Sequence, residues 1–521
     1  MKIVDVSGMR AIEQECFDQG ISASDLMDRA GFGVANRVHS ILEELRTKSK
    51  SILILAGPGN NGGDGLVAAS YLSDYRYDIT IYLPFGSKEH VSKINDLVNK
   101  GVNILYPEDG VDDAHLRLLL SSMDVVVDAI LGTGKSRKLD DSLLKILDIV
   151  NEAKRISPTL IVVSVDIPTG INPDTGEQDE SSILSDFTLT LGCPKFGLFN
   201  APGIASVGIL EVIDIGIPGV ITEDGNEELI TVDSVKSLLP KRPLDSHKGT
   251  YGKVLVVAGS ERYIGAAKLA CESALRVGAG LVTLAIPRNL QPSISTSLTE
   301  ITYLPLPDDL DEFIADAPDL ILDELPRYDA VLIGCGLGQS FAVQQLLKQT
   351  LFSNRFPEIP IILDADALNI MAESPEWWTY INNNTIVTPH PGEMSRLTGL
   401  KVSDINGNRL NVARENSKKW SKTVILKGPY SVISSADGPV RVSPFINPVL
   451  ASAGTGDVLA GMVAGFVAQG LSNFDAATLG VFIHGSAGKW LKENVGDTGV
   501  LASDLLLELP YEISRLKEAL I

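Results

Sequence analysis

Short runs rich in Val, Ile and Leu alternate with amphipathic stretches along most of this chain. Such alternation is typical of α/β layering, in which helices cover a mostly parallel sheet. We predict two series of strands, at residues 51–56, 79–83, 124–130, 160–166 and 187–191, and then at 253–258, 281–286, 330–333, 361–364, 385–387 and 423–426. Helices are predicted near the end of the chain, at 456–469 and 476–493. The sequence therefore predicts an α/β fold.

Two domains are expected, because 521 residues exceed the usual size of one hydrophobic core. The stretch GIPGVITEDGNEELITVDS separates the two series of strands and is rich in glycine and acidic residues. We predict a first domain at residues 1–218, a linker at 219–232 and a second domain at 233–521. Each domain is expected to have three α/β/α layers, and the first to be Rossmann-like.

The composition excludes several kinds of partner. A formal charge of −22 opposes binding to nucleic acid or to an anionic membrane surface. The most apolar run, residues 458–468, is far shorter than the ~20 residues that span a bilayer. Four cysteines lie far apart without a C-x-x-C pair, and the first residues lack the apolar core of a signal peptide. We therefore expect a cytoplasmic protein that acts on small molecules.

A glycine-rich loop follows the first predicted strand, and residues 57–62 fit G-x-G-x-x-G. A dinucleotide-binding dehydrogenase also needs an acid at the end of its second strand, but residues 83–88 contain none before Glu89. Asp64 stands where it would repel a pyrophosphate. A second motif, LGTGKSRK, lacks the first glycine of a P-loop, since Ala129 lies five residues before Gly134. Neither standard phosphate-binding motif is therefore present.

Oxygen-bearing side chains follow three predicted strands of the first domain. The carboxyl ends of parallel strands meet at one edge of a sheet, where ligands bind. Amide, carboxylate and hydroxyl oxygens suit a hard cation, and residues 132–138 offer amides and positive charge to an anionic substrate. Each side chain taken alone could instead be a turn former or helix cap. The residues concerned are Asn60, Asn61, Asp64, Asp128, Asp166 and Thr169.

Four stretches, AGPGNNGGDGLVAASYL, VVVDAILGTG, VSVDIPTGINPDTG and DIGIP, resemble the NAD(P)H-hydrate epimerase domain. The resemblance implies interconversion of the R and S hydrates at C6 of the nicotinamide ring, with Asp166 as acid/base. It also implies a potassium ion held by Asn61, Asp128 and Thr169. The implied substrate contacts are Asn60, Asn61, Gly62, Gly63, Asp64, Gly132, Thr133, Gly134, Lys135, Ser136, Arg137, Lys138 and Asp166.

In the second domain, Gly454-Thr-Gly-Asp457 opens a long predicted helix. Amides at a helix N-terminus attract phosphate, and Asp457 beside them can take a proton from a hydroxyl, as phosphoryl transfer requires. Lys427 can add a cation beside a nucleotide. Asp457 could also be only a first-turn acid that favours the helix dipole. Two further residues have plain structural interpretations, since His390 resembles a packed loop histidine and Cys335 a small buried residue.

This half resembles the ribokinase-like superfamily, and more narrowly the ADP/ATP-dependent NAD(P)H-hydrate dehydratases. The motifs are SHKGTYGKVLVVAGS, GAAKLA, GCGLG, DADALN, TPHPGEM and GTGDVLAG. The resemblance implies a ribokinase-like α/β/α domain with Asp457 catalytic, and ADP with Mg²⁺ as co-substrate, ATP being the alternative. One departure is Cys335, where the family pattern predicts proline. The implied contacts are Ala266, Gly338, His390 and Asp457 for the hydrated cofactor, and Lys427, Gly428, Pro429, Tyr430, Ser431 and Gly456 for the nucleotide.

The two resemblances together imply one bifunctional enzyme that repairs hydrated NADH and NADPH. Phosphorylation of the added hydroxyl would make it a good leaving group, and elimination would restore the dihydronicotinamide. A homo-oligomer is expected, a tetramer being one possible form. Two alternatives stay open: the second domain could be a small-molecule kinase that leaves phosphate on its product, and the first could be a ligand-binding scaffold without catalysis.

Overall fold

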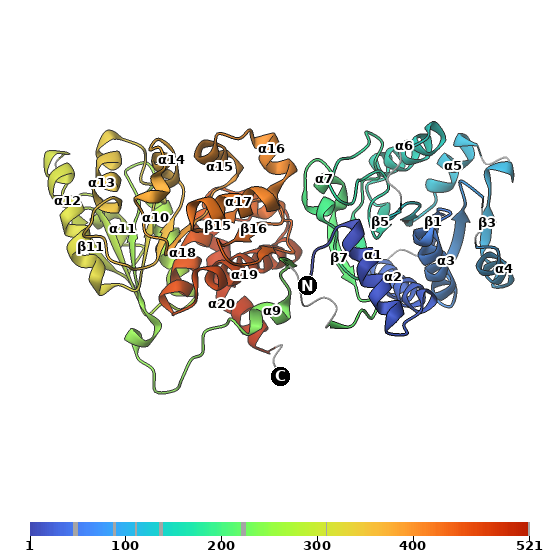
Figure 1. Ribbon diagram of the computed structural model, residues 1–521, viewed down its shortest axis with the longest axis horizontal. Helices are drawn as coiled ribbons and strands as arrows, with labels where there is room; N and C mark the ends of the chain where they lie inside the picture. The colour runs from blue at the N-terminus through green and yellow to red at the C-terminus, as the bar shows by residue number, and fades with distance from the viewer. Residues whose placement is uncertain are drawn as a thin grey trace. The chain divides into compact units, whose positions relative to one another are not determined.

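The computed structural model describes residues 1–44, 50–86, 90–109, 112–134, 139–219, 226–308 and 310–518, and only the backbone of 310–313. The chain divides into two compact units, the first built from Met1–Gly225 and Asn406–Asn408 and the second from Asn226–Ile405 and Arg409–Ile521 (Figure 1). Both units contain a sheet with helices on its two faces. The predicted α/β class is confirmed.

The first unit contains a seven-stranded sheet in the order β3-β2-β1-β4-β5-β6-β7, and every neighbouring pair is parallel. All five predicted strands are confirmed to within one residue at each end. The edge strands β3 and β7 were not predicted. The bounds are β1 Ser51–Ala56, β2 Asp78–Tyr82, β3 Asn103–Leu105, β4 Val125–Ala129, β5 Ile161–Val165, β6 Phe187–Leu191 and β7 Ile209–Ile213.

The alternating side chains of β1 divide the first unit into two cores. Ile52 and Ile54 pack in one core with helices α1 to α4, whereas Leu53 and Leu55 pack in the other with α5 and α6 (Figure 1). A strand buried on both faces reads as a continuous apolar run, which explains why the sequence located it. The helices are α1 Val6–Asp18, α2 Ala23–Glu44, α3 Asn60–Ser73, α4 Val91–Asn99, α5 Asp113–Leu120, α6 Asp141–Ile156 and α7 Ile204–Val207.

The second unit contains a ten-stranded sheet in the order β11-β10-β9-β12-β13-β14-β15-β16-β17-β8. In this spatial order, every neighbouring pair from β11 through β10 and β9 to β15 is parallel. Strands β16 and β17 continue the sheet as antiparallel neighbours. The six predicted strands are confirmed, and β8, β11, β16 and β17 were not predicted. The bounds are β8 Glu227–Leu229, β9 Lys253–Val257, β10 Leu281–Pro287, β11 Thr302–Leu306, β12 Ala330–Ile333, β13 Ile361–Leu363, β14 Thr385–Val387, β15 Thr423–Leu426, β16 Val432–Ser434 and β17 Val440–Val442.

Strand β8 lies inside the range 219–232 that the sequence assigned to a linker. It pairs in parallel with β17 and forms an edge of the second sheet. Its two acidic residues interrupt the apolar pattern from which a strand is predicted. Across the strand pair, Arg441 Nε donates to Glu228 Oε2 at 3.2 Å. The C-terminal part of the predicted linker therefore belongs to the second unit.

The long helices α18 and α19 are central to the second core, as the sequence predicted. Helix α18 packs closely on α10, and a Cβ at Gly461 would lie 2.1 Å from the Ala270 carbonyl oxygen, so this approach requires glycine. The helices are α9 Val232–Lys236, α10 Ile264–Arg276, α11 Gln291–Ser295, α12 Leu310–Glu324, α13 Phe341–Leu351, α14 Asp366–Ala372, α15 Pro391–Thr398, α16 Val402–Gly407, α17 Arg409–Trp420, α18 Thr455–Ala468, α19 Asn473–Asn494 and α20 Ala502–Glu518.

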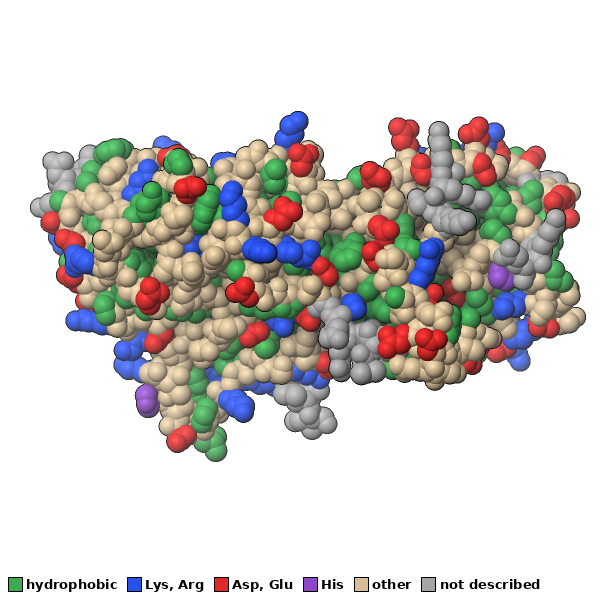
Figure 2. Space-filling view, viewed as in Figure 1, with side chains coloured by type: hydrophobic (Ala, Val, Ile, Leu, Met, Phe, Trp, Pro, Cys, Tyr) green, Lys and Arg blue, Asp and Glu red, His purple; other side chains and the backbone are tan. Residues whose placement is uncertain are grey.

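Surface and thiol chemistry are ordinary for a globular protein. On the face drawn in Figure 2, Lys and Arg side chains are interspersed with Asp and Glu side chains over both units. All four cysteines are buried free thiols. Within the described parts of the chain, every helix is too short or too polar to cross a bilayer.

Candidate active sites

A buried cluster of oxygen atoms lies at the end of β4. Thr169 donates to the Asp128 carboxylate twice, from its Oγ1 at 2.7 Å and from its backbone N at 2.8 Å. Ser164 Oγ donates to the same carboxylate at 2.9 Å. Burial raises the pKa of Asp128, while the hydrogen bonds from Thr169 and Ser164 lower it. The structure therefore brings together two of the three predicted potassium ligands.

The third predicted ligand, Asn61, lies in the first turn of α3. Its side chain is buried, and neither Oδ1 nor Nδ2 has a hydrogen-bond partner in the described part of the chain. A buried unsatisfied polar group costs about 1–3 kcal/mol. The segment after β4 lies between Asn61 and the cluster, since Leu131 N donates to Thr169 Oγ1 and a Cβ at Gly132 would lie 3.2 Å from Asn61 Oδ1. An unpaired amide oxygen beside this cluster fits a hard monovalent cation.

A cavity of about 1300 Å³ opens next to these residues. Of the predicted substrate contacts, Gly62 and Gly63 are buried and do not line the cavity, and the same holds for the predicted potassium ligands Asp128 and Thr169. Lys135, Ser136, Arg137 and Lys138 lie outside the described residues. The predicted residues that line the cavity are Asn60, Asn61, Asp64, Gly132, Thr133, Gly134 and Asp166.

The glycine loop that fits a dinucleotide fingerprint has a packing explanation. A Cβ at Gly57 would lie 1.9 Å from the Ile130 carbonyl oxygen, and one at Gly62 would lie 1.9 Å from the Gly57 carbonyl oxygen. The loop after β1 therefore presses directly on the segment after β4, and only glycine fits at these two positions.

Asp166 lies directly after β5 with a φ of 65°, in the left-handed region that disfavours a residue with a side chain. Its carboxylate Oδ1 accepts from Leu191 N at 3.2 Å and forms an ion pair with Lys195. Such backbone strain is characteristic of functional sites. The sequence analysis missed Lys195; its position shortly after the end of β6, another strand end, is the signal that could have found it.

Two further acids complete this wall of the cavity. Burial raises the pKa of Asp64 well above its usual value, and the negative charge of Asp166 adds to the rise. Burial also raises the pKa of Glu13, which the sequence analysis did not single out, although the Lys195 charge opposes that shift. Both side chains line the cavity with Asp166. The site therefore holds three neighbouring carboxyl groups and one buried cation.

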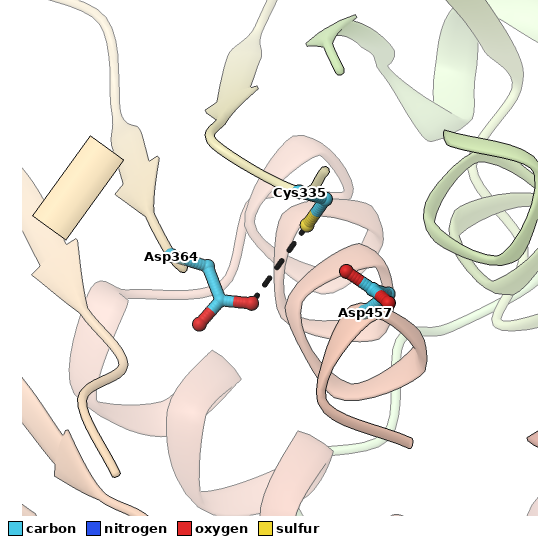
Figure 3. A group of neighbouring side chains, drawn as sticks. All are labelled: Cys335, Asp364 and Asp457. Carbon is cyan, nitrogen blue, oxygen red and sulfur yellow. Dashed lines mark hydrogen bonds between the residues drawn. The ribbon is translucent and has the colours of Figure 1, made fainter. Parts of the chain in front are cut away.

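In the second unit, Asp457 lies in the first turn of α18, which follows Gly454 with a φ of 91°. Figure 3 shows its carboxyl close to Cys335 and Asp364, and the ligand atoms of the three lie within 4.8 Å of one another. Burial raises the pKa of Asp457 to about 6, and the charge of Asp364 adds to the rise. Asp457 is therefore placed as a carboxyl that titrates near neutral pH.

Lys427 supplies the positive charge of this cluster. Its Nζ lies 2.6 Å from Asp364 Oδ1 and 3.9 Å from Glu393 Oε2. Thr388 Oγ1 also donates to Asp364 Oδ1, at 2.6 Å. Burial raises the pKa of Glu393 to about 7. The sequence analysis missed both acids as site residues, although Asp364 lies in the quoted motif DADALN and Glu393 in TPHPGEM.

The predicted nucleotide contacts partly converge. A Cβ at Gly456 would lie 3.5 Å from Lys427 Nζ, which places two of them side by side. Gly428 N donates to Ser431 Oγ at 3.3 Å, which closes the turn around Pro429. The side chain of Tyr430 is fully buried, so only its backbone can face a ligand in this structure.

The predicted contacts with the hydrated cofactor lie on three other segments. His390 caps α15, where its Nδ1 accepts from Gly392 N at 3.0 Å, and half of its side chain remains exposed. Gly338 N donates to Asp366 Oδ2 at 2.8 Å. Ala266 lies on α10, and a Cβ at Gly336 would be 2.7 Å from its Cβ. Their predicted contacts with substrate stay predictions.

The cysteine that departs from the family pattern is a buried residue, as predicted. Cys335 has no exposed surface, and its Sγ lies 3.7 Å from Asp364 Oδ2. Burial, followed by the charges of Asp457 and Asp364, raises the pKa of this thiol well above its usual value. A neutral thiol of this kind is a poor nucleophile.

Both halves of the chain match known family models. Residues 23–197 match the model described as YjeF-related protein N-terminus, and residues 254–511 match the model described as NAD(P)H-hydrate dehydratase.

Full-length relatives cover almost the whole chain. The bifunctional NAD(P)H-hydrate repair enzyme Nnr of Moorella thermoacetica is 37% identical over 502 residues, which is 95% of this chain and 93% of the relative. That of Thermofilum pendens is 35% identical over 99% of this chain and 97% of the relative. Among solved structures, the ADP/ATP-dependent NAD(P)H-hydrate dehydratase of Bacillus subtilis, co-crystallised with ATP/Mg²⁺, is 34% identical over 56% of this chain and 98% of that chain, with a TM-score of 0.48. By these full-length matches, the chain belongs to the family of bifunctional NAD(P)H-hydrate repair enzymes.

Proposed function

We propose that this chain restores NADH and NADPH from their hydrates, with one activity in each domain. Residues 1–218 interconvert the R and S hydrates, and the second unit, which begins at Asn226, dehydrates the S hydrate at the expense of a nucleotide. The observation that carries the proposal is the full-length family match, joined by a carboxyl at the start of α18 whose pKa is about 6. A general base works best when its pKa lies near the operating pH.

In the dehydratase domain, Asp457 takes the proton from the C6 hydroxyl as the hydroxyl oxygen attacks the terminal phosphorus of the nucleotide. The bond from that phosphorus to the bridging oxygen breaks, and the nucleotide leaves with one phosphate fewer. The amides of residues 454–456 stabilise the charge that develops on the transferred phosphoryl group. Loss of phosphate from C6 and of a proton from C5 then restores the ring double bond. Mg²⁺ bound with the nucleotide would neutralise part of the charge of its phosphates. Lys427 and Gly456, which lie side by side, are proposed to face the nucleotide.

In the epimerase domain, the substrate occupies the cavity of about 1300 Å³. This volume exceeds the ~300–1000 Å³ typical of drug-sized ligands, as a dinucleotide requires. Asp166 lies on the wall of the cavity and transfers the proton of the C6 hydroxyl. Asn61, Asp128 and Thr169 would hold a potassium ion, whose charge favours an anionic substrate in a wall rich in carboxyl groups.

ADP is proposed as the usual donor, with ATP as the alternative, on family resemblance alone. We also propose a cytoplasmic location, since four buried free thiols suit a reducing compartment. A homo-oligomer is proposed on the same family basis. The two alternative functions, a kinase with a stable phosphorylated product and a non-catalytic scaffold, are not favoured, because the family match covers both halves.

In the test, the full chain is incubated with an R/S mixture of hydrated NADH, potassium, magnesium and either ADP or ATP. Return of dihydronicotinamide absorbance and release of phosphate are followed together. Complete recovery with stoichiometric phosphate supports both activities, and the more effective nucleotide identifies the donor. Recovery that stops when the S hydrate is spent would overturn the epimerase assignment. A stable phosphorylated product would overturn the dehydratase assignment in favour of a kinase.

A further inference from the structure

Lys195 is almost completely buried at the edge of the epimerase cavity, with 1% of its side chain exposed. Its ammonium group has three N–H donors. It forms an ion pair with Asp166, donates to the Leu191 carbonyl oxygen at 3.1 Å, and lies 3.4 Å from Thr190 Oγ1. All three donors therefore have acceptors inside the protein. A buried ammonium engaged in this way acts on Asp166 rather than on a ligand.

The Asp166 carboxylate is held from one side. In the part of the chain that the structure describes, its hydrogen bonds with Lys195, Leu191 and Thr190 all end on Oδ1. Asp166 also lines the cavity, so Oδ2 is the oxygen that can exchange a proton with a ligand. The contacts of Oδ1 with Lys195, Leu191 and Thr190 fix this orientation of the carboxylate.

Lys195 is the counter-charge to a group of acids. The Asp166 charge raises the pKa of both Asp64 and Glu13, and the Lys195 charge lowers both. Without a cation here, three carboxyl groups would share one desolvated wall and repel one another. The titratable and charged groups around the pair are Glu13 and Arg10 of α1, Asp64 of α3, Lys93 of α4, and Cys193 in the segment that carries Lys195.

We propose that Lys195 is a positioning residue that pairs with Asp166 and aims its carboxylate at the cavity, so that Asp166 is the base that starts epimerisation. This inference rests on the proposed epimerase function.

One carboxylate carries out both proton transfers of the step. Asp166 Oδ2 takes the proton of the C6 hydroxyl, the oxygen forms a C=O bond to C6, and the C6–N1 bond breaks. The electron pair of that bond goes to N1, and Asp166 returns the proton to N1. Closure on the other face of the carbonyl reverses each move and yields the other epimer. Nothing is oxidised or reduced, and no further reactant is needed.

The test measures R/S exchange from about pH 5 to 9 in the full chain and in Lys195→Met, Lys195→Gln and Lys195→Arg. Loss of the positive charge should move the acidic limb of the rate profile to higher pH by at least about one unit. The rate on that limb then falls about tenfold or more, and it recovers at higher pH. Lys195→Arg should keep the limb near its wild-type position.

Lys154→Met is the matched control. Lys154 also forms an ion pair with an aspartate, its Nζ lying 2.7 Å from Asp186 Oδ2. Neither residue of this pair lines the cavity. Its profile should keep the wild-type shape. An equal loss of rate at every pH in Lys195→Met and Lys195→Gln would mean that Lys195 is only structural, and would overturn the inference.

A second measurement does not depend on whether the Lys195 variants fold. The infrared difference between wild type and Asp166→Asn should show an ionised Asp166 at pH 7, and a protonated Asp166 there would overturn the inference. Wild-type protein that fails to exchange the epimers would overturn the proposed function itself. Normal wild-type exchange with an unshifted limb in the neutral variants would overturn only the role of Lys195.

Discussion

The Lys427 ammonium lies 2.6 Å from the Asp364 carboxylate, and that carboxylate is part of the same buried cluster as Asp457. The pair fixes a negative charge next to the proposed base. Burial, followed by repulsion from Asp364, raises the pKa of Asp457 to about 6, although the Lys427 charge opposes the rise. A carboxylate with this pKa is still ionised at neutral pH, yet it binds a proton more tightly than an ordinary aspartate. Asp364 therefore tunes the base without touching the hydroxyl.

Asp457→Asn should abolish dehydration and spare epimerisation. Removal of a general base costs about 10²–10⁴-fold in rate. The measurement is phosphate release with purified S hydrate, alongside R/S exchange in the same preparation. Asp504, another acid in the first turn of a helix, is the control; Asp504→Asn should lose at most about 1 kcal/mol of stability and no activity. Equal activity of Asp457→Asn and wild type would reduce Asp457 to a dipole-favouring acid.

The dehydration rate should fall as the pH drops through about 6, because Asp457 must be ionised to accept a proton. Asp364→Asn removes the like charge that raises this pKa, so the acidic limb should move to lower pH even if the maximum rate falls. Asp366 acts more weakly on Asp457, and Asp366→Asn should shift the limb less. The pH dependence of kcat/KM for S hydrate checks all three proteins. A limb that moves upward in Asp364→Asn would contradict this electrostatic account.

The interior strands could be predicted from the sequence because both of their faces are buried. Val125–Ala129 is buried at every position and reads as a continuous apolar run. Four of the missed strands, β3, β7, β8 and β11, lie at sheet edges, where partly exposed side chains interrupt the apolar pattern, as in Glu227–Leu229. The other two, β16 and β17, are largely buried but only three residues long. Local apolar patterning therefore locates the core of each sheet but not its borders.

The site divides in the same way between local motifs and distant partners. Asn61 and Asp457 lie in the first turns of helices and Asp128 lies near the end of β4, and their motifs are short and local. Lys195 reaches Asp166 across 29 residues of sequence, and Lys427 reaches Asp364 across 63. No spacing rule in a single sequence identifies such a pair, because the sheet order creates it.

Cys335 should be chemically silent in the folded protein. Its thiol is buried, and burial with the neighbouring acids raises its pKa. Iodoacetamide at neutral pH should leave the dehydration rate unchanged, and Cys335→Ala should cost about 1 kcal/mol of stability through the lost sulfur packing. Mass spectrometry before and after unfolding locates the alkylated residues. Rapid alkylation of Cys335 in native protein, with parallel loss of activity, would show instead that the thiol is accessible.

Asn61→Ala should weaken the potassium dependence of epimerisation with little loss of stability in potassium-free buffer. The Asn61 side chain has no hydrogen-bond partner among the described residues, so its removal breaks no bond within the protein, whereas a bound cation would lose one oxygen ligand. We expect the potassium concentration for half-maximal exchange to rise about tenfold, measured with choline as the replacement cation.

Asn151 is the control, since it is also buried but donates to Ser182 O at 2.9 Å. Asn151→Ala should lose about 1–3 kcal/mol of stability and keep the potassium response. An unchanged potassium response in Asn61→Ala, or a stability loss equal to that of Asn151→Ala, would mean that Asn61 is not a cation ligand but part of the packing of α3.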